Sequence, residues 1–154
     1  MHTAISSDKL DLSSEKKTEE FARKFVKNLK PGNIVFLHGE IGVGKTTFVR
    51  YLINIFQKVN KLKITEVTSP TFNLLNEYQI KKIKINHYDL FRIKTTNEIK
   101  DLNLFDDNEN TITLIEWPQI IEKKPKNLIE LIFEYGKDHQ TRFVRIKGLN
   151  FTSK

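Results

Sequence analysis

Residues 39–46 read GEIGVGKT and match the phosphate-binding loop pattern GxxxxGK[ST] at every fixed position. The glycines allow backbone conformations that other residues avoid, so that successive N–H groups can point at a bound anion. In such a loop, Lys45 brings a positive charge to the β- and γ-phosphates of a nucleotide, and the Thr46 hydroxyl is a ligand for Mg²⁺. The loop also requires a strand before it and a helix after it, so it constrains the fold strongly.

The residues that flank the loop supply both elements. Residues 33–38 are mostly β-branched or aromatic and predict a short buried strand. Residues 47–57 place apolar side chains at helical spacing around more than half of the circumference, as expected for a helix packed on a sheet. The free N–H groups and the positive dipole end of this helix would face the same anion as the loop. The order of the three elements therefore argues against a chance glycine-rich turn.

The size of the chain favours one domain. Its 154 residues, of which 38% are hydrophobic, are enough for a single packed core and too few for two domains of ordinary size. The absence of cysteine excludes disulfides, thiolate metal sites and cysteine nucleophiles. No apolar run approaches the roughly 20 residues that cross a bilayer, and the first residues lack the pattern of a signal peptide. We therefore expect a cytoplasmic protein, with residues 1–12 as an irregular segment and residues 13–154 as one domain.

The charge of the chain suggests an acidic partner. The formal net charge is +7 and the pI is near 9.5, which suits a nucleotide, RNA or an acidic protein face. The lysines are scattered over polar stretches at residues 58–63, 81–84 and 123–126, and scattered charge is usually a solvated surface. Direct contact with RNA is therefore the less favoured interpretation.

An amphipathic helix is predicted before the phosphate loop. Ser13 or Ser14 offers an N-cap, and an apolar stripe follows among charged residues. The helix must end by Pro31 and Gly32. Its apolar stripe is most simply a face that packs on the core.

Residues 67–71 form a hydroxyl-rich segment in which Pro70 excludes a regular helix or a central strand. A loop that contains Thr71 can act as a switch that senses the γ-phosphate, and an ordinary serine and threonine turn is the simpler alternative. Strands follow at residues 72–78 and 83–88. Their short connection predicts an antiparallel hairpin.

Two acids are predicted at strand ends. Asp89 follows the strand at residues 83–88, a usual place for a carboxylate that orients a metal ion or a water molecule. Glu116 ends the apolar strand at residues 111–116, which has the form of a Walker B strand. Glu116 reaches Mg²⁺ or the attacking water only if this strand lies beside residues 33–38 in a parallel sheet. The alternative is a salt-bridged glutamate.

The remaining segments predict shorter elements. Residues 95–98 fit a capping box that starts a short helix, and a turn is expected at residues 106–110. Trp117, the only tryptophan, either borders a bound base or packs in the core. Strands at residues 128–135 and 141–147 form a final hairpin. The four histidines show no metal-ligand spacing and are expected to be structural or exposed.

Four motifs in this order resemble the bacterial TsaE (YjeE) family of ATPases. They are GEIGVGKTTF at residues 39–48, TSPTF at 68–72 with NEY at 76–78, HYDLFR at 87–92, and EWP at 116–118. The resemblance covers about residues 14–147. It implies an α/β fold with a single three-layer P-loop NTPase-like domain, in which helices flank a mixed parallel and antiparallel sheet.

The resemblance also implies an activity and partners. The activity is Mg²⁺-dependent ATP hydrolysis, required for threonylcarbamoylation of adenosine 37 in tRNAs that read ANN codons. The implied partners are the TsaD and TsaB proteins, in a complex whose turnover the ATPase supports without performing the transfer step. Contact with tRNA would be indirect, through that complex.

The resemblance assigns roles to the motif residues by position. Lys45, Asp89 and Glu116 are the catalytic set: Lys45 holds phosphate, and Asp89 is an essential acid near the nucleotide. Thr46 and Glu116 hold the metal ion, and Thr71 belongs to the switch-like loop. The residues implied in nucleotide binding are Gly39, Glu40, Ile41, Gly42, Val43, Gly44, Lys45, Thr46, Thr47, Thr71 and Trp117.

Two positions depart from the family pattern. Val43 replaces the smaller residue that is usual between the last two glycines, which could alter loop packing and turnover rate. Gln119 stands where an acid often follows the Trp-Pro pair. Neither departure falls on a residue with an assigned role in catalysis or metal binding.

Three other functions remain open. A small nucleoside or metabolite kinase shares the loop and the fold, but it generally needs an arginine-bearing lid, and the sequence has no obvious lid insertion. A GTPase is disfavoured because no Asn-Lys-x-Asp segment is present. The third is a nucleotide-gated binding module, whose partner affinity would follow nucleotide state even if Glu116 or Asp89 were uncharged.

Overall fold

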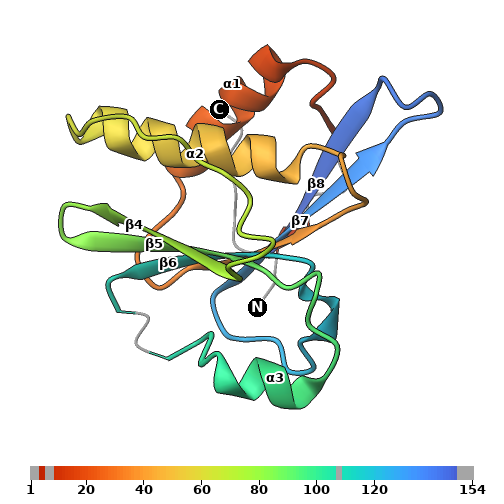
Figure 1. The fold of residues 1–154 in the computed structure, drawn as a ribbon. Helices are drawn as coiled ribbons and strands as arrows, with labels where there is room; N and C mark the ends of the chain where they lie inside the picture. Colours follow the sequence, from red (N-terminus) through yellow and green to blue (C-terminus); the bar gives the residue numbers. More distant parts are fainter. Residues whose placement is uncertain (1–3, 6–8, 107–108, 149–154) are drawn as a thin grey trace.

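The computed structural model describes residues 4–5, 9–106 and 109–148. A twisted sheet lies between two layers: helices α1 and α2 cover one face, and the short helix α3 lies against the other (Figure 1). The expected three-layer α/β architecture is confirmed. In the part of the chain that the structure describes, no helix is long and apolar enough to cross a membrane.

The sheet has the strand order β1-β8-β7-β3-β6-β5-β4, with β2 also paired to β8. Its strands are β1 (Ala4–Ile5), β2 (Leu10–Asp11), β3 (Ile34–His38), β4 (Leu75–Ile80), β5 (Ile83–Asp89), β6 (Thr111–Glu116), β7 (Leu128–Tyr135) and β8 (Arg142–Gly148). The four inner strands β7, β3, β6 and β5 run parallel, while β4 and β8 add antiparallel edges. Both predicted hairpins, β4–β5 and β7–β8, are therefore confirmed.

The first helical layer carries the larger core. Helix α1 (Glu15–Val26) begins at Ser14, whose side chain accepts a hydrogen bond from the Lys17 backbone N–H, as the N-cap prediction required. Helix α2 (Lys45–Val59) follows the phosphate loop directly. Phe21 and Phe25 of α1 pack on Phe48 of α2, with ring centroids 5.3 to 5.6 Å apart. This aromatic contact fixes α1 on the helix that starts the candidate site.

A second, smaller core lies on the opposite face. Helix α3 (Thr96–Asp101) is capped by Thr95, which accepts from the Glu98 backbone N–H, so the predicted N-cap and short helix are confirmed. The Glu98 carboxylate accepts from the Thr95 hydroxyl and from the Lys94 N–H, so the second bond of the predicted box is made one residue earlier. Ile115, Phe36 and Tyr88 point to this face, together with Leu104 from the segment after α3. The one-turn helix η1 (Pro118–Ile120) completes the layer.

Two predicted boundaries were wrong. The strand expected from residue 72 begins at Leu75, because residues 70–74 form a turn in which the Leu74 N–H donates to the Pro70 carbonyl over 2.7 Å and Leu74 has φ 67°. The segment expected to be irregular contains β1 and β2, which pair with β8 because that strand otherwise leaves an open edge. In the predicted turn at residues 106–110, residues 107–108 lie outside the described part.

Candidate functional site

A cavity of about 340 Å³ opens at the carboxyl ends of β3, β5 and β6. Ligands of open α/β sheets bind at this edge, because loops that follow parallel strands converge there. The cavity is lined by Ile41, Gly42, Gly44, Lys45, Thr46, Thr47, Ser69, Thr71, Asp89, Phe91, Glu116 and Trp117. The three predicted catalytic residues therefore lie in one place, although the first and the last of them are 71 positions apart in the chain.

The phosphate loop adopts a conformation that only its glycines allow at low cost. Gly42 and Gly44 have φ 79° and 115°, and Gly44 is the N-cap of α2. At Gly39, a Cβ atom would lie 2.8 Å from both the Phe133 carbonyl oxygen and the Val43 side chain. The larger side chain of Val43, which departs from the family pattern, is buried and packs in the core beside the loop.

Lys45 is the first residue of α2 and is only 4% exposed. Its ammonium group donates to the Gly39 carbonyl and lies 3.6 Å from the centroid of the Trp117 ring. Burial lowers the pKa of Lys45 below its usual value, although the nearby carboxylates of Glu116 and Asp89 oppose the shift. The partners of this buried ammonium are one carbonyl and one ring, neither of which carries a full negative charge. An anion that entered the cavity would therefore compete well for it.

Glu116 lies directly beside the phosphate loop. Strand β6 pairs with β3 in parallel, with Glu116 opposite Leu37, so the neighbour relation that a Walker B acid requires is confirmed. The Thr46 hydroxyl lies 3.2 Å from each carboxylate oxygen of Glu116. The two predicted metal ligands are thus in mutual contact at the floor of the cavity.

Asp89 is held by the hydroxyl-rich segment. Its Oδ2 atom accepts hydrogen bonds from Ser69, at 3.1 Å, and from Thr71, at 3.2 Å. Its Oδ1 atom accepts from the Phe91 backbone N–H at 2.9 Å. The segment therefore does more than turn the chain, because it presents two hydroxyls to an acid that lines the cavity.

His87 was missed by the sequence interpretation, which treated every histidine as structural or exposed. It is fully buried on β5, and its Nε2 atom lies 2.7 Å from Oε2 of Glu116. One signal was available in the sequence: His87 and Asp89 are two residues apart on one strand, so their side chains share a face. A residue on the same strand face as Asp89 is expected to lie near the same site.

Trp117 stands at the mouth of the cavity in a left-handed conformation with φ 58°. Such a conformation costs a bulky residue about 1–3 kcal/mol and persists only where its surroundings impose it. The indole lies 4.9 Å from the Phe91 ring, between centroids, and under the Lys45 ammonium. The tryptophan therefore borders the site and also packs on a neighbour, so both interpretations of it hold in part.

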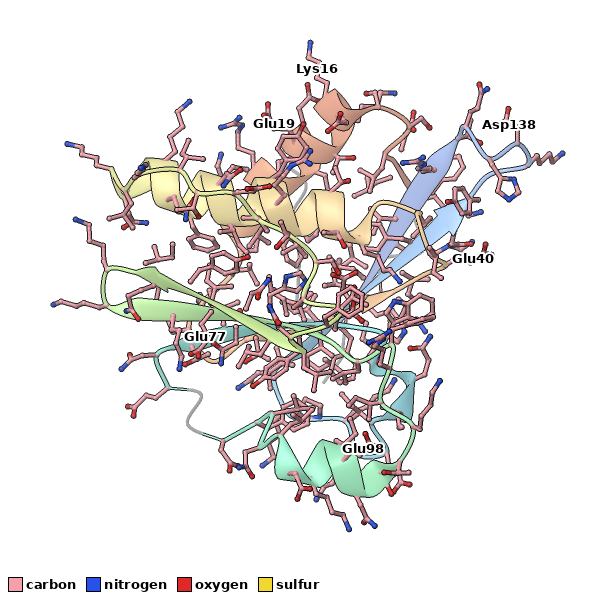
Figure 2. The ribbon with its side chains drawn as sticks, viewed as in Figure 1. Lys16, Glu19, Glu40, Glu77, Glu98 and Asp138 are labelled. Carbon is pink, nitrogen blue, oxygen red and sulfur yellow. The ribbon has the colours of Figure 1, made fainter. Side chains whose placement is uncertain are left out.

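Three predicted nucleotide-binding residues do not line the cavity. Gly39 and Glu40 border a shallower hollow together with Gln119, and Val43 is buried beneath the loop. Figure 2 shows Glu40 at the outside of the molecule with its side chain directed outward. Gly39 still contributes, because its carbonyl accepts from Lys45.

A second cavity, of about 550 Å³, adjoins the first and shares Gly44 and Thr47 with it. It lies where the start of α1 meets the β7–β8 hairpin and is lined by Leu12, Ser13, Ser14, Glu15, Thr18, Val43, Gly44, Thr47, Arg50, His139, Gln140 and Arg142. The Nε atom of Arg142 is buried and makes no hydrogen bond among the described residues. The His139 ring lies on Tyr135, with centroids 4.6 Å apart.

The donor set at the floor of the first cavity consists of oxygen atoms. Thr46 and Glu116 provide a hydroxyl and a carboxylate, and Asp89 provides a second carboxylate nearby. Over residues 4–5, 9–106 and 109–148, no group of three or more His, Cys, Asp or Glu side chains is arranged to hold a metal ion. The oxygen donors of Thr46, Glu116 and Asp89 fit Mg²⁺, which uses one or two carboxylates, retains water and takes oxygen ligands from bound phosphates.

A family model described as threonylcarbamoyl adenosine biosynthesis protein TsaE matches residues 12–144. Proteins named tRNA threonylcarbamoyladenosine biosynthesis protein TsaE are similar over most of the chain. The one from Rickettsia typhi is 42% identical over 141 residues, which cover 91% of this chain and 94% of that protein. The one from Rickettsia bellii is 46% identical over 121 residues, covering 78% and 81%. A cyanobacterial one, from Nostoc, is 33% identical over 150 residues, covering 94% and 88%.

A solved structure supports the fold independently. The crystal structure of Bacillus subtilis YdiB superposes with a TM-score of 0.69 and covers 97% of this chain and 90% of that chain. The sequence identity is 21%, so this similarity concerns the fold alone.

Proposed function

The chain belongs to the TsaE family of threonylcarbamoyladenosine biosynthesis proteins, and from that premise we propose that it is a Mg²⁺-dependent ATPase serving threonylcarbamoylation of adenosine 37 in tRNA. The observation that carries this proposal is the contact between the Thr46 hydroxyl and the Glu116 carboxylate, at 3.2 Å, beneath a complete phosphate loop. P-loop NTPases bind their metal ion with two protein groups, the hydroxyl of the loop and an acid at the end of a neighbouring strand.

The loop and Lys45 would hold the phosphates. Gly42 and Gly44 have the positive φ angles that would let loop N–H groups face the phosphates, and α2 would add its free N–H groups and dipole. Lys45 would leave the Gly39 carbonyl and the Trp117 ring for the β- and γ-phosphate oxygens. Because its ammonium is already buried, it gives up little hydration when it makes this exchange.

Thr46 and Glu116 would hold Mg²⁺, as the oxygen donor set described above fits. When bound, the ion neutralises the charge that develops on the β- and γ-phosphates. The Thr46 oxygen can offer a lone pair to a cation while its hydrogen still points at Glu116. The carboxylate would then fix the orientation of the hydroxyl.

Asp89 would orient the attacking water. A water oxygen bonds to the γ-phosphorus, the bond to the β–γ bridging oxygen breaks, and ADP leaves with that oxygen while the water's proton passes to phosphate or solvent. Asp89 accepts from Ser69 and Thr71, so a change in either hydroxyl would move the carboxylate. This link supports a switch role for the segment that contains Thr71.

The nucleoside would occupy the second cavity. That cavity shares Thr47 and Gly44 with the phosphate cavity, which supports one ligand extending through both. The Nε atom of Arg142 is a buried donor without a hydrogen bond in the described part, and Arg50 and His139 line the same space. These groups can bind ribose hydroxyls or base nitrogens.

The proposed partners are TsaD and TsaB, whose complex would require the ATPase for repeated turnover. The test is ATP hydrolysis by the purified chain, alone and with TsaB and TsaD from the same source. We expect hydrolysis to rise with the partners and to be lost in Lys45→Ala. Lys58→Ala, near the end of the same helix α2, is the matched control and should behave as wild type.

Other outcomes would contradict the proposal. If the partners have no effect and phosphate appears on an added nucleoside or metabolite, the protein is a kinase. If partner affinity follows nucleotide state and tRNA modification persists in Glu116→Gln, hydrolysis is incidental and the protein is a nucleotide-gated binding module.

A further inference from the structure

We infer that His87 is a positioning residue that fixes the carboxylate of Glu116 for the metal ion; the inference rests on the proposed function. His87 lies on β5 and Glu116 at the end of β6, the next strand of the sheet. The Nε2 to Oε2 distance is 2.7 Å, and the side chains are 0% and 3% exposed. This is a short contact between two buried side chains, and a hydrogen bond between buried groups is worth more than one at the surface.

The chemistry of the contact sets the tautomer of His87. An ionised carboxylate only accepts hydrogen bonds, so the hydrogen must sit on Nε2. Nδ1 is buried and makes no hydrogen bond in the described residues. With the hydrogen on Nε2, Nδ1 is an acceptor left unfilled, which costs less than an unpaired N–H.

The unpaired Nδ1 argues against a purely structural role. Leu114 and Ile85, neighbours of His87 on β6 and β5, are fully buried and apolar. An apolar residue at position 87 would continue that pattern without a buried polar atom that lacks a partner. Unsatisfied buried groups are rare in folded proteins, and function is a common reason to retain one.

His87 supplies what Thr46 alone cannot. Thr46 has one hydroxyl hydrogen, shared between two carboxylate oxygens at equal distances of 3.2 Å. That symmetry leaves the rotation of the carboxylate poorly defined. The bond from His87 is made to Oε2 alone, at 2.7 Å, so it distinguishes the two oxygens and fixes the rotation of the carboxylate. Groups that orient a metal ligand in this way typically contribute tenfold to a hundredfold, in order of magnitude, to metal affinity or activity.

Two amide variants test the inference. In His87→Gln the amide nitrogen can reach the position of Nε2 and donate to Glu116, whereas in His87→Asn the shorter side chain places it near Nδ1. The first measurement is Mn²⁺ affinity of the ADP-bound protein by electron paramagnetic resonance. The second is ADP affinity without metal, by calorimetry.

We expect metal affinity close to wild type in His87→Gln and weakened by about tenfold to a hundredfold in His87→Asn, with metal-free ADP affinity unchanged in both. Equal metal affinity in wild type and a folded His87→Asn would overturn the inference. So would an equal loss in both variants, or a loss of metal-free ADP binding. If His87→Asn does not fold, His87→Met, which fills the space without a donor, takes its place under the same criteria.

The two proposals fail differently. If the wild-type protein binds no ADP and no Mn²⁺ with it, the proposed function fails. If the wild-type protein binds ADP and Mn²⁺, and the variants bind Mn²⁺ with the same affinity, only the proposed role of His87 is wrong.

Discussion

Asp89 and Glu116 are direct register partners: each is the last residue of its strand, and the two lie opposite one another in the parallel pair β5 and β6. They are nevertheless held by different groups. Glu116 accepts hydrogen bonds from Thr46 and His87, and Asp89 accepts from the hydroxyls of the segment at residues 67–71. Two acids at one sheet edge with separate supports can carry separate roles.

Substitution of the two acids should separate those roles. We expect Asp89→Asn and Glu116→Gln each to lower the rate of ATP hydrolysis by about a hundredfold or more. Only Glu116→Gln should weaken Mn²⁺ binding to the ADP-bound protein, because Asp89 is assigned to the water. Equal loss of metal affinity in both variants would show that the acids act on the metal together.

The second cavity, where we propose that the nucleoside binds, gives a second prediction. Arg142→Ala should lower ATP affinity by about tenfold, because it removes the buried donor, and leave inorganic tripolyphosphate affinity unchanged. Arg145→Ala is the control: it lies on the same strand, pairs with Glu134 over 2.7 Å, and does not line the cavity. Competition calorimetry with both ligands measures the difference. If Arg142→Ala lowered the affinities for ATP and for tripolyphosphate equally, Arg142 would bind phosphate and not the nucleoside.

The third prediction concerns the glycine that starts the loop. Gly39→Ala should lower the free energy of unfolding by at least about 2 kcal/mol, because the new Cβ would meet the Phe133 carbonyl and its φ of 147° is unfavourable for alanine. Gly42→Ala, whose Cβ meets only the Tyr135 hydroxyl at 3.3 Å, should cost less. Urea denaturation compares the two. A larger cost at position 42 would contradict the packing argument.

The fourth prediction is a pH dependence of stability. Burial would raise the pKa of Glu130, but hydrogen bonds from His38 and Lys124, at 2.9 and 3.1 Å, outweigh it and hold the pKa below 4.5. Since the unfolded carboxyl binds protons first, this stabilisation is fully present above pH 4.5 and is lost as the pH falls through the lower folded pKa.

Melting temperatures of wild type and Glu130→Gln check that dependence. Wild type should melt higher at pH 6, and the gap should close as the pH falls below 4.5. The other carboxyls titrate in both proteins and cancel in the difference. A gap that widened on acidification would contradict the assignment.

The sequence predicted the elements whose signals are local. The phosphate loop predicted the strand β3 before it and the helix α2 after it. The pattern at residues 95–98 predicted the start of α3, and alternating or apolar runs predicted the longer strands. The parallel pairing of β3 and β6 was stated only as a condition, because no residue of either strand identifies its neighbour. The grouping of Lys45, Asp89 and Glu116 followed from the motifs in their familiar order.

What the sequence did not reveal depends on register and on weak local signals. The contact of His87 with Glu116 requires knowing that β5 lies beside β6 and by what offset. The two-residue strands β1 and β2 are too short for a periodic pattern, and they form because the edge of β8 accepts them. The turn that ends at Leu74 requires a leucine with a positive φ, a conformation that is rare for this residue type and that the sequence therefore does not predict.

The position of Trp117 makes the protein its own spectroscopic probe. The chain has one tryptophan, so all indole emission arises at the mouth of the first cavity. In the structure the Lys45 ammonium lies 3.6 Å from that ring, so the proposed transfer of this charge to a phosphate would change the electric field on the indole. If the proposed function holds, stopped-flow fluorescence of the unlabelled protein would follow nucleotide binding and release in real time, and would do so within the proposed complex once the tryptophans of the partners are replaced.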